Sequence, residues 1–132
     1  MQLLFKNILI LGSISNTATP SYLASKYFFN KGFNVFALSS NNILNKELRI
    51  IDEKLDPNYK QSSIDIISIF VNPKKQIKYY KFILSLHPKR IIFNPGTEND
   101  ELILLAKINN IEIIKGCSIS LFVNGLIEHS TS

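Results

Sequence analysis

The chain has 132 residues, of which 45% are hydrophobic and 19% charged, a balance typical of one folded domain and not of a disordered segment. This length argues against a two-domain enzyme with a separate substrate domain, and the single cysteine excludes an intrachain disulfide and fits a reducing compartment. Lys and Arg total 15 against 10 Asp and Glu, and the net charge of +5 raises the question of a nucleic-acid or phosphate ligand. Since no long apolar run is present, we expect no transmembrane helix.

The first part of the chain predicts two strands joined by a helix. Residues 7–11 (NILIL) form a continuous apolar run that is typical of a strand buried on both faces. After a polar loop, we expect a helix to begin at Pro20, with Thr19 as its N-cap, and to end near Gly32. Residues 34–38 (NVFAL) predict the second strand.

The second part of the chain repeats this alternation. Residues 65–71 (DIISIFV) predict a strong strand, and Asn72-Pro73 repeats the cap-then-proline signal that opens a helix. That helix should end at His87-Pro88, because the residue before a proline disfavours helical dihedral angles. Residues 90–93 (RIIF) predict the next strand.

Four further segments complete the predicted elements. We expect a turn at residues 94–96, a helix capped by Thr97, a last strand at 111–114 and a short helix near 118–123. Residues 47–59 are less clear, although their apolar residues could form a short third strand.

Alternating strands and helices imply right-handed β-α-β units and a parallel sheet. We therefore predict one α/β domain over residues 1–132, a Rossmann-like doubly wound parallel sheet of about five strands with helices on both faces. Ligands of such sheets bind beyond the carboxyl ends of the strands, near the point where the strand order reverses. The loops expected at that edge are residues 12–19, 39–44, 72–75, 94–99 and 115–118.

The first of these loops argues against two common nucleotide ligands. A dinucleotide fingerprint needs three glycines, but only Gly12 is present, and Ile14 and Thr17 occupy the other two positions. The second strand ends at Ser39-Ser40, without the acidic residue that holds the ribose of NAD. The phosphate-loop pattern is also absent. Hydroxyls and backbone N–H groups at a helix N-terminus can still hold a phosphate, but the loop could equally be an ordinary capped loop.

Several motifs together resemble one family of small proteins. These are Ile10 to Ser13 with the loop that follows, Gly32 to Val35, Asn72 to Lys74, the long run from Pro88 to Asn99, and Cys117 after the last strand. The chain resembles the stand-alone CoA-binding domain proteins, which are Rossmann-like relatives of the CoA-binding domain of succinyl-CoA synthetase alpha subunits. The resemblance covers nearly the whole chain.

The resemblance implies a cytoplasmic domain that binds coenzyme A or an acyl-CoA. The pyrophosphate would lie against the first loop, the adenosine ribose and its phosphate beside the end of the second strand, and the adenine along the helix after the central strand. In that order, the implied residues are Gly12, Ser13 and Ser15 with Asn16 in the same loop, Ser39 and Ser40, then Asn72, Pro73 and Lys74, with Asn94, Pro95, Gly96 and Thr97 along the far edge. Cys117, after the last strand, is a further candidate binding residue.

The residues support binding more than catalysis, since no nucleophile–base pair and no metal-ligand cluster stands out. We expect a regulatory or carrier module. Two alternatives remain, namely an enzyme or enzyme subunit acting on an acyl-CoA or nucleotide, and a protein-interaction domain that has lost its ligand. Lys74 is the cation best placed for a phosphate, and the lack of an aromatic-basic motif argues against nucleic acid. We expect Gly12→Val to abolish binding in a folded protein. The sequence leaves open whether Cys117 is reactive and whether the chain forms a homodimer or has a protein partner.

Overall fold

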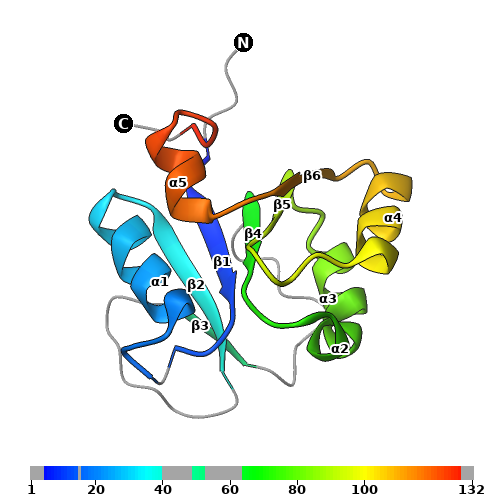
Figure 1. Ribbon diagram of the computed structural model, residues 1–132, viewed down its shortest axis with the longest axis horizontal. Helices are drawn as coiled ribbons and strands as arrows, with labels where there is room; N and C mark the ends of the chain where they lie inside the picture. Colours follow the sequence, from blue (N-terminus) through cyan, green and yellow to red (C-terminus); the bar gives the residue numbers. More distant parts are fainter. Residues whose placement is uncertain (1–4, 15, 40–48, 53–63, 129–132) are drawn as a thin grey trace.

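Six parallel strands form one sheet in the computed structural model, which describes residues 5–14, 16–39, 49–52 and 64–128. The strand order is β3-β2-β1-β4-β5-β6 (Figure 1). This order confirms the predicted Rossmann-like α/β fold, with β3 formed in the stretch that the sequence left unclear. The strands are β1 (Asn7–Leu11), β2 (Asn34–Ser39), β3 (Arg49–Asp52), β4 (Ile66–Ile69), β5 (Arg90–Phe93) and β6 (Glu112–Lys115).

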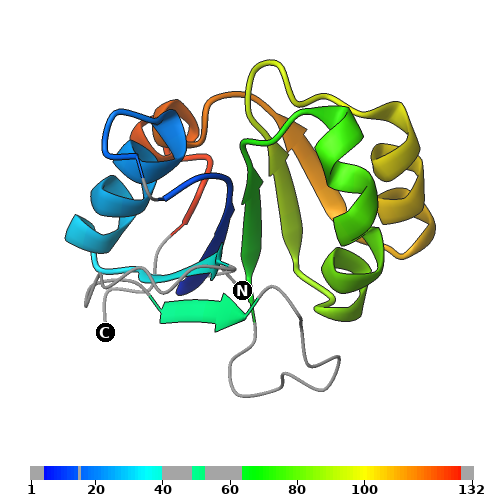
Figure 2. The same ribbon diagram turned by 90° about the horizontal axis from the view of Figure 1, so that it is seen from below.

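Helices cover both faces of the sheet, as Figures 1 and 2 show. The helices α1 (Pro20–Asn30) and α5 (Ser118–Val123) lie against each other on one face. The other face carries α2 (Pro73–Gln76), a short 3-10 turn η1 (Ile77–Tyr79), α3 (Tyr80–Ser85) and α4 (Asp100–Ile108). Within the described residues, no helix is long and apolar enough to cross a membrane.

The sheet separates two hydrophobic cores, and β1 supplies both. Ile8 and Ile10 face the core beneath α1 and α5, whereas Leu9 and Leu11 face the core beneath α3 and α4. All four side chains are at most 2% exposed, so each contributes roughly 1.5–3 kcal/mol to folding. The continuous apolar run of β1 therefore follows from its central place in the sheet, where neither face meets solvent.

The predicted helix caps are confirmed at two positions and wrong at a third. Thr19 caps α1 and Asn72 caps α2, each with a proline at the first helical turn. Thr97 does not cap α4, because its hydroxyl donates to Asn94 O at 2.7 Å and closes the preceding turn. Asn99 caps α4 instead, and its Oδ1 accepts from the backbone N–H groups of Glu101 and Leu102 at 3.1 and 3.4 Å.

The reversal of strand order falls between β1 and β4, which are hydrogen-bonded neighbours in parallel register. The chain leaves β1 toward α1 on one face of the sheet and leaves β4 toward α2 on the other. Because the two loops diverge, a crevice opens between them at the carboxyl edge.

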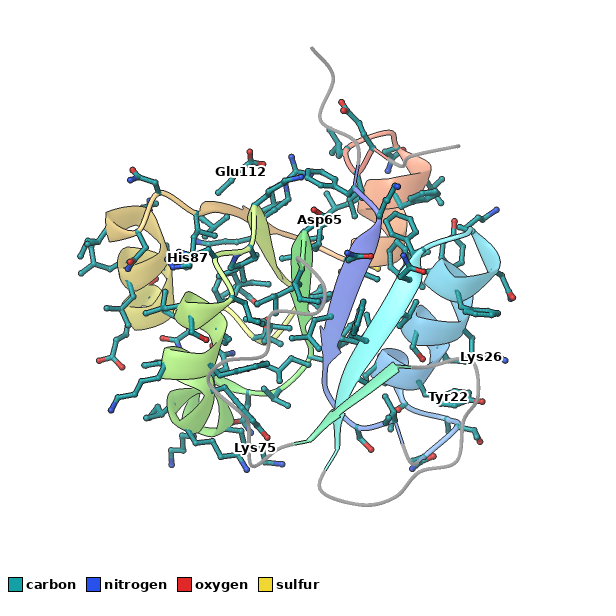
Figure 3. All side chains as sticks on the ribbon, turned by 180° about the vertical axis from the view of Figure 1, so that it is seen from behind. Tyr22, Lys26, Asp65, Lys75, His87 and Glu112 are labelled. Atoms are coloured by element: carbon teal, nitrogen blue, oxygen red, sulfur yellow. The ribbon has the colours of Figure 1, made fainter. Side chains whose placement is uncertain are left out.

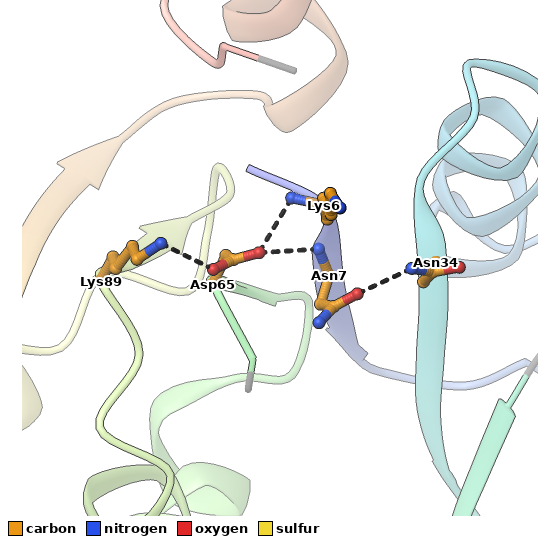
Figure 4. A network of polar contacts seen from close by, with 5 residues as sticks. All are labelled: Lys6, Asn7, Asn34, Asp65 and Lys89. Carbon is orange, nitrogen blue, oxygen red and sulfur yellow. Dashed lines mark hydrogen bonds and ion pairs between the residues drawn. The ribbon is translucent and has the colours of Figure 1, made fainter. Parts of the chain in front are cut away.

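At the end of the sheet where the strands begin, opposite the crevice, one buried carboxylate links neighbouring strands. Asp65 is 7% exposed, and its Oδ2 accepts from the backbone N–H groups of Lys6 and Asn7 at 2.8 and 2.9 Å (Figure 4). Its Oδ1 lies 3.0 Å from Lys89 Nζ. Asn34 Nδ2 donates to Asn7 Oδ1 at 2.9 Å, which extends the network to β2. Four neighbouring strands are thus fastened where they begin, away from the crevice.

We expect Asp65→Ala to lower the free energy of unfolding by about 2–4 kcal/mol, because two backbone donors and a partly buried ammonium group lose their acceptor. Urea denaturation followed by circular dichroism measures the change. Glu112→Ala removes an ion pair whose carboxylate is largely exposed, so it should cost less than about 1 kcal/mol. Equal losses in the two variants would contradict the role given to Asp65.

Candidate functional site

Two adjoining hollows lie in the crevice between the loops after β1 and β4, and both are lined by Pro20 and Phe70. The polar compartment has a volume of about 370 Å³ and is lined by Ser13, Thr19, Pro20, Ser21, Phe70, Val71, Asn72 and Lys75. The apolar compartment has a volume of about 190 Å³ and is lined by Pro20, Leu23, Ala24, Phe70, Asn94, Cys117 and Ile119.

Gly12 sets the width of the crevice without lining it. A Cβ at this position would lie 2.7 Å from Ser21 Cβ and 2.8 Å from Phe70 Cβ, closer than real Cβ contacts. The absent side chain thus lets α1 and the end of β4 approach each other. A valine would displace both neighbours, so we now expect Gly12→Val to destabilise the fold, in contrast to the expectation from the sequence that it leaves a folded protein.

The loop after β1 is held in shape by its own polar groups. Thr19 Oγ1 donates to Ser13 O and Asn16 O, at 3.0 and 2.8 Å, and accepts from the N–H of Tyr22. The hydroxyl of Ser21 also donates to Ser13 O. Asn16 Oδ1 accepts from Ala18 N–H at 2.9 Å, which leaves this side chain exposed but already bonded within the loop. The polar compartment therefore has a preformed wall at the N-terminus of α1.

The facing wall comes from the first turn of α2. Asn72 Oδ1 accepts from Lys75 N–H at 3.0 Å, and both residues line the polar compartment. Figure 3 places Lys75 at the end of the molecule away from Asp65 and Glu112. Pro73 and Lys74 belong to the same turn, but neither lines the compartment. The cation in the wall is thus Lys75 and not Lys74, which the sequence favoured.

The side chain of Asn94 is a buried link between three segments and is 4% exposed. Its Nδ2 donates to Ser68 Oγ at 2.9 Å and to Ile69 O at 2.8 Å, both in β4. Its Oδ1 accepts from Ser118 N–H and Ser118 Oγ, at 2.9 and 3.0 Å. These bonds use both donors and both lone pairs, so the amide fixes the start of α5 at the apolar compartment and has no bond left for a ligand.

The rest of the turn after β5 lies outside both compartments. Pro95 and Gly96 are exposed, and Gly96 has a φ of 91°, which favours glycine. Gly96 N–H donates to Glu98 Oε1 at 2.6 Å. The backbone N–H groups of Glu98 and Gly96 lower the pKa of the Glu98 carboxyl. Thr97 is buried, so among the four residues expected along this edge only Asn94 reaches a hollow.

Cys117 precedes α5 and lines the apolar compartment with an exposed, free thiol. Its side chain makes no capping hydrogen bond of normal geometry. The backbone N–H of Ser120, in the first turn of α5, still lowers the pKa of the thiol, helped by the Ser120 hydroxyl and the backbone of Ile119 and opposed by partial burial. The thiolate fraction at neutral pH is thereby raised.

Three expected site residues cannot be placed as side chains. Ser15 and Ser40 lie outside the described residues, and Ser39 is described only as the last residue of β2. Conversely, the sequence analysis did not single out several lining residues. Phe70, Leu23 and Ile119 were not among the expected site residues, and only the placement of the crevice shows that they line it. In the described part of the chain, no cluster of His, Cys, Asp or Glu could hold a metal ion.

The fold defines a Rossmann-like domain, and the crevice at its strand-order reversal is the candidate ligand site. A family model described as a CoA binding domain matches residues 6–122. The chain therefore belongs to this CoA-binding domain family. None of the curated proteins matches it.

Solved structures share the fold of this chain. One described only as an uncharacterized protein is 30% identical with a TM-score of 0.76, and the match covers 94% of this chain and 98% of the other. A protein from Thermus thermophilus (cell-free ID.343) is 16% identical with a TM-score of 0.80, covering 91% and 90%. A hypothetical protein from Pyrococcus horikoshii OT3 is 20% identical with a TM-score of 0.79, covering 92% and 84%. The last two likenesses concern the fold alone.

We expect Gly12→Ala to lower the free energy of unfolding by about 1–3 kcal/mol, because its methyl group overlaps Ser21 Cβ and Phe70 Cβ. Thermal and urea denaturation measure the effect. Asn30→Ala, at an exposed position in the last turn of α1, is the matched control and should shift stability by less than about 0.5 kcal/mol. A Gly12→Ala protein as stable as the parent would contradict the close packing.

The Cys117 thiol should be alkylated by iodoacetamide with a pH midpoint below that of the same thiol in the urea-unfolded chain, because its pKa is lowered in the folded state. Ser120→Ala removes the hydroxyl that helps lower the pKa, so it should move the folded-state midpoint upward. Mass spectrometry at a series of pH values follows the reaction. A folded-state midpoint equal to or above the unfolded one would refute the assignment.

Proposed function

We propose that the protein binds coenzyme A or a CoA derivative, with the phosphate groups in the polar compartment, as a regulatory or carrier module without catalysis of its own. The observation that carries the proposal is the position of this compartment. It lies at the carboxyl edge, between the two strands where the order reverses, in a chain that belongs to the CoA-binding domain family.

The chemistry of the polar compartment supports an anionic ligand. The N-terminus of α1, an eleven-residue helix, opens beside it and carries a partial positive charge. Lys75 adds a full positive charge from the facing wall, and Ser13 and Asn72 add polar groups. No Asp or Glu occurs among its lining residues, so no described lining carboxylate opposes a phosphate. A pyrophosphate between the two walls would meet favourable charge from both.

The lining residues also support binding without catalysis. Neither compartment has a His, Asp or Glu among its lining residues, and Cys117 has no such group beside it in the apolar compartment to serve as a general base. The N-terminal loop bonds to itself and the Asn94 amide is fully used, which suits a preformed binding surface. A cytoplasmic location and the absence of nucleic-acid binding stay predictions from the sequence.

Isothermal titration calorimetry with CoA tests the proposal, with NAD and ATP as comparison ligands. We expect binding of CoA, weaker binding at higher salt, and an affinity about three- to tenfold lower in Lys75→Ala, because one phosphate loses its cation. Lys107→Ala removes an exposed lysine from the last turn of α4, outside both compartments, and should bind CoA unchanged. If CoA gives no heat and no rise in melting temperature, the proposed function is wrong.

A further inference from the structure

The apolar compartment differs in chemistry from the polar compartment beside it. None of its lining residues is charged, and only Asn94 and Cys117 carry a polar side-chain atom. The amide of Asn94 is saturated by bonds to Ser68, Ile69 and Ser118. The remaining lining consists of aliphatic and aromatic groups, Leu23 and Ile119 among them. A ligand group that forms hydrogen bonds with water would lose those bonds there without replacement, whereas a hydrocarbon group has no such bonds to lose.

The size of the compartment limits that hydrocarbon. Its volume is about 190 Å³. An apolar protein cavity of about 150 Å³ is known to take up benzene, so a group of roughly six carbon atoms is the upper limit. A long fatty-acyl chain is therefore too large to be enclosed.

The two compartments adjoin, since Pro20 and Phe70 line both. A single ligand that places its phosphates in one compartment and a hydrocarbon group in the other matches this order of polar and apolar walls, and in an acyl-CoA the pantetheine arm lies between these two groups. The same helix contributes to both compartments, because Ser21 and Leu23 both lie in the first turn of α1.

We propose that the apolar compartment binds the short, uncharged acyl group of an acyl-CoA, and that Leu23 determines this preference. The inference rests on the proposed function and adds the substrate class. A dicarboxylic acyl group, such as succinyl, would bring a carboxylate into a lining without a cation, and burial of an unpaired charge is strongly unfavourable.

Among the lining residues, Leu23 is the one whose substitution should disturb the fold least. It is 54% exposed and stands at the rim, whereas Ala24 is 1% exposed and belongs to the core beneath α1. A lysine at position 23 keeps a long aliphatic stem and adds a cation at the mouth of the compartment. Leu104 is 59% exposed on α4, outside the compartment, and Leu104→Lys is the matched control.

The test compares the affinities of CoA, acetyl-CoA, butyryl-CoA and succinyl-CoA by calorimetry, each expressed relative to CoA so that the added charge of a variant cancels. For the parent protein we expect butyryl-CoA to bind tighter than CoA, by roughly fourfold for each methylene that becomes buried. Succinyl-CoA should bind more weakly than butyryl-CoA. Leu23→Lys should reverse the order of these two ligands, and Leu104→Lys should preserve it.

The outcomes separate this inference from the function on which it rests. If none of the four ligands binds the parent protein, the proposed function is wrong and the acyl preference with it. If CoA binds but butyryl-CoA binds no tighter, CoA binding stands and the acyl preference is overturned. A Leu23→Lys protein that loses affinity for all four ligands equally would also overturn it, and would assign the compartment to the dimethyl group of the pantetheine arm. The parent series needs no variant, so it decides the matter even if Leu23→Lys fails to fold.

Discussion

The close approach at Gly12 is the constraint on which the crevice depends. A hydrogen in place of a side chain lets Ser21 in α1 and Phe70 after β4 come together over the end of β1. Phe70 and the neighbouring Pro20 then form the wall common to the polar and apolar compartments. The same glycine therefore serves the packing of α1 and the shape of the candidate site, so the two roles cannot be separated by a substitution there. In a dinucleotide fingerprint the third glycine allows the close packing of helix and strand, whereas Gly12 has this role from the first position.

Several polar residues near the crevice hold the scaffold and are not free for a ligand. The buried Asn94 amide joins β4 to the start of α5. Behind the crevice, Gln76 Nε2 donates to Val71 O at 2.9 Å and Thr97 O at 2.8 Å, and its Oε1 accepts from Asn99 at 2.9 Å. Buried side-chain amides need such complete pairing, because each unpaired group would cost stability. The groups left to contact a ligand are those at the rim of the crevice.

The sequence predicted the fold well because its signals are local. The apolar run of β1 and the cap-then-proline pairs at Thr19 and Asn72 depend only on neighbouring residues, and the structure has each of them. The candidate site was harder to predict because it depends on distant segments. Whether Lys74 or Lys75 faces the crevice is decided by the turn that Asn72 starts. Thr97 does not cap α4, because its hydroxyl bonds within the turn at Asn94. Leu23 and Phe70 line a hollow only because two loops from opposite faces meet there, which hydrophobic periodicity does not encode.

The walls of the crevice belong to two helical layers that pack on opposite faces of the sheet. The α1 wall rests on the core that contains Ala24, and the α2 wall leads into helices over the core that contains Phe82. A ligand between the walls would contact both helical layers directly and so connect them independently of the strands. Any ligand that binds only the folded chain adds to its stability, by about 2.7 kcal/mol at a hundred times its dissociation constant. Occupancy of the crevice would therefore lower the fraction of unfolded protein, which is the form that proteases degrade. The cellular concentration of the ligand would then affect the abundance of the protein itself.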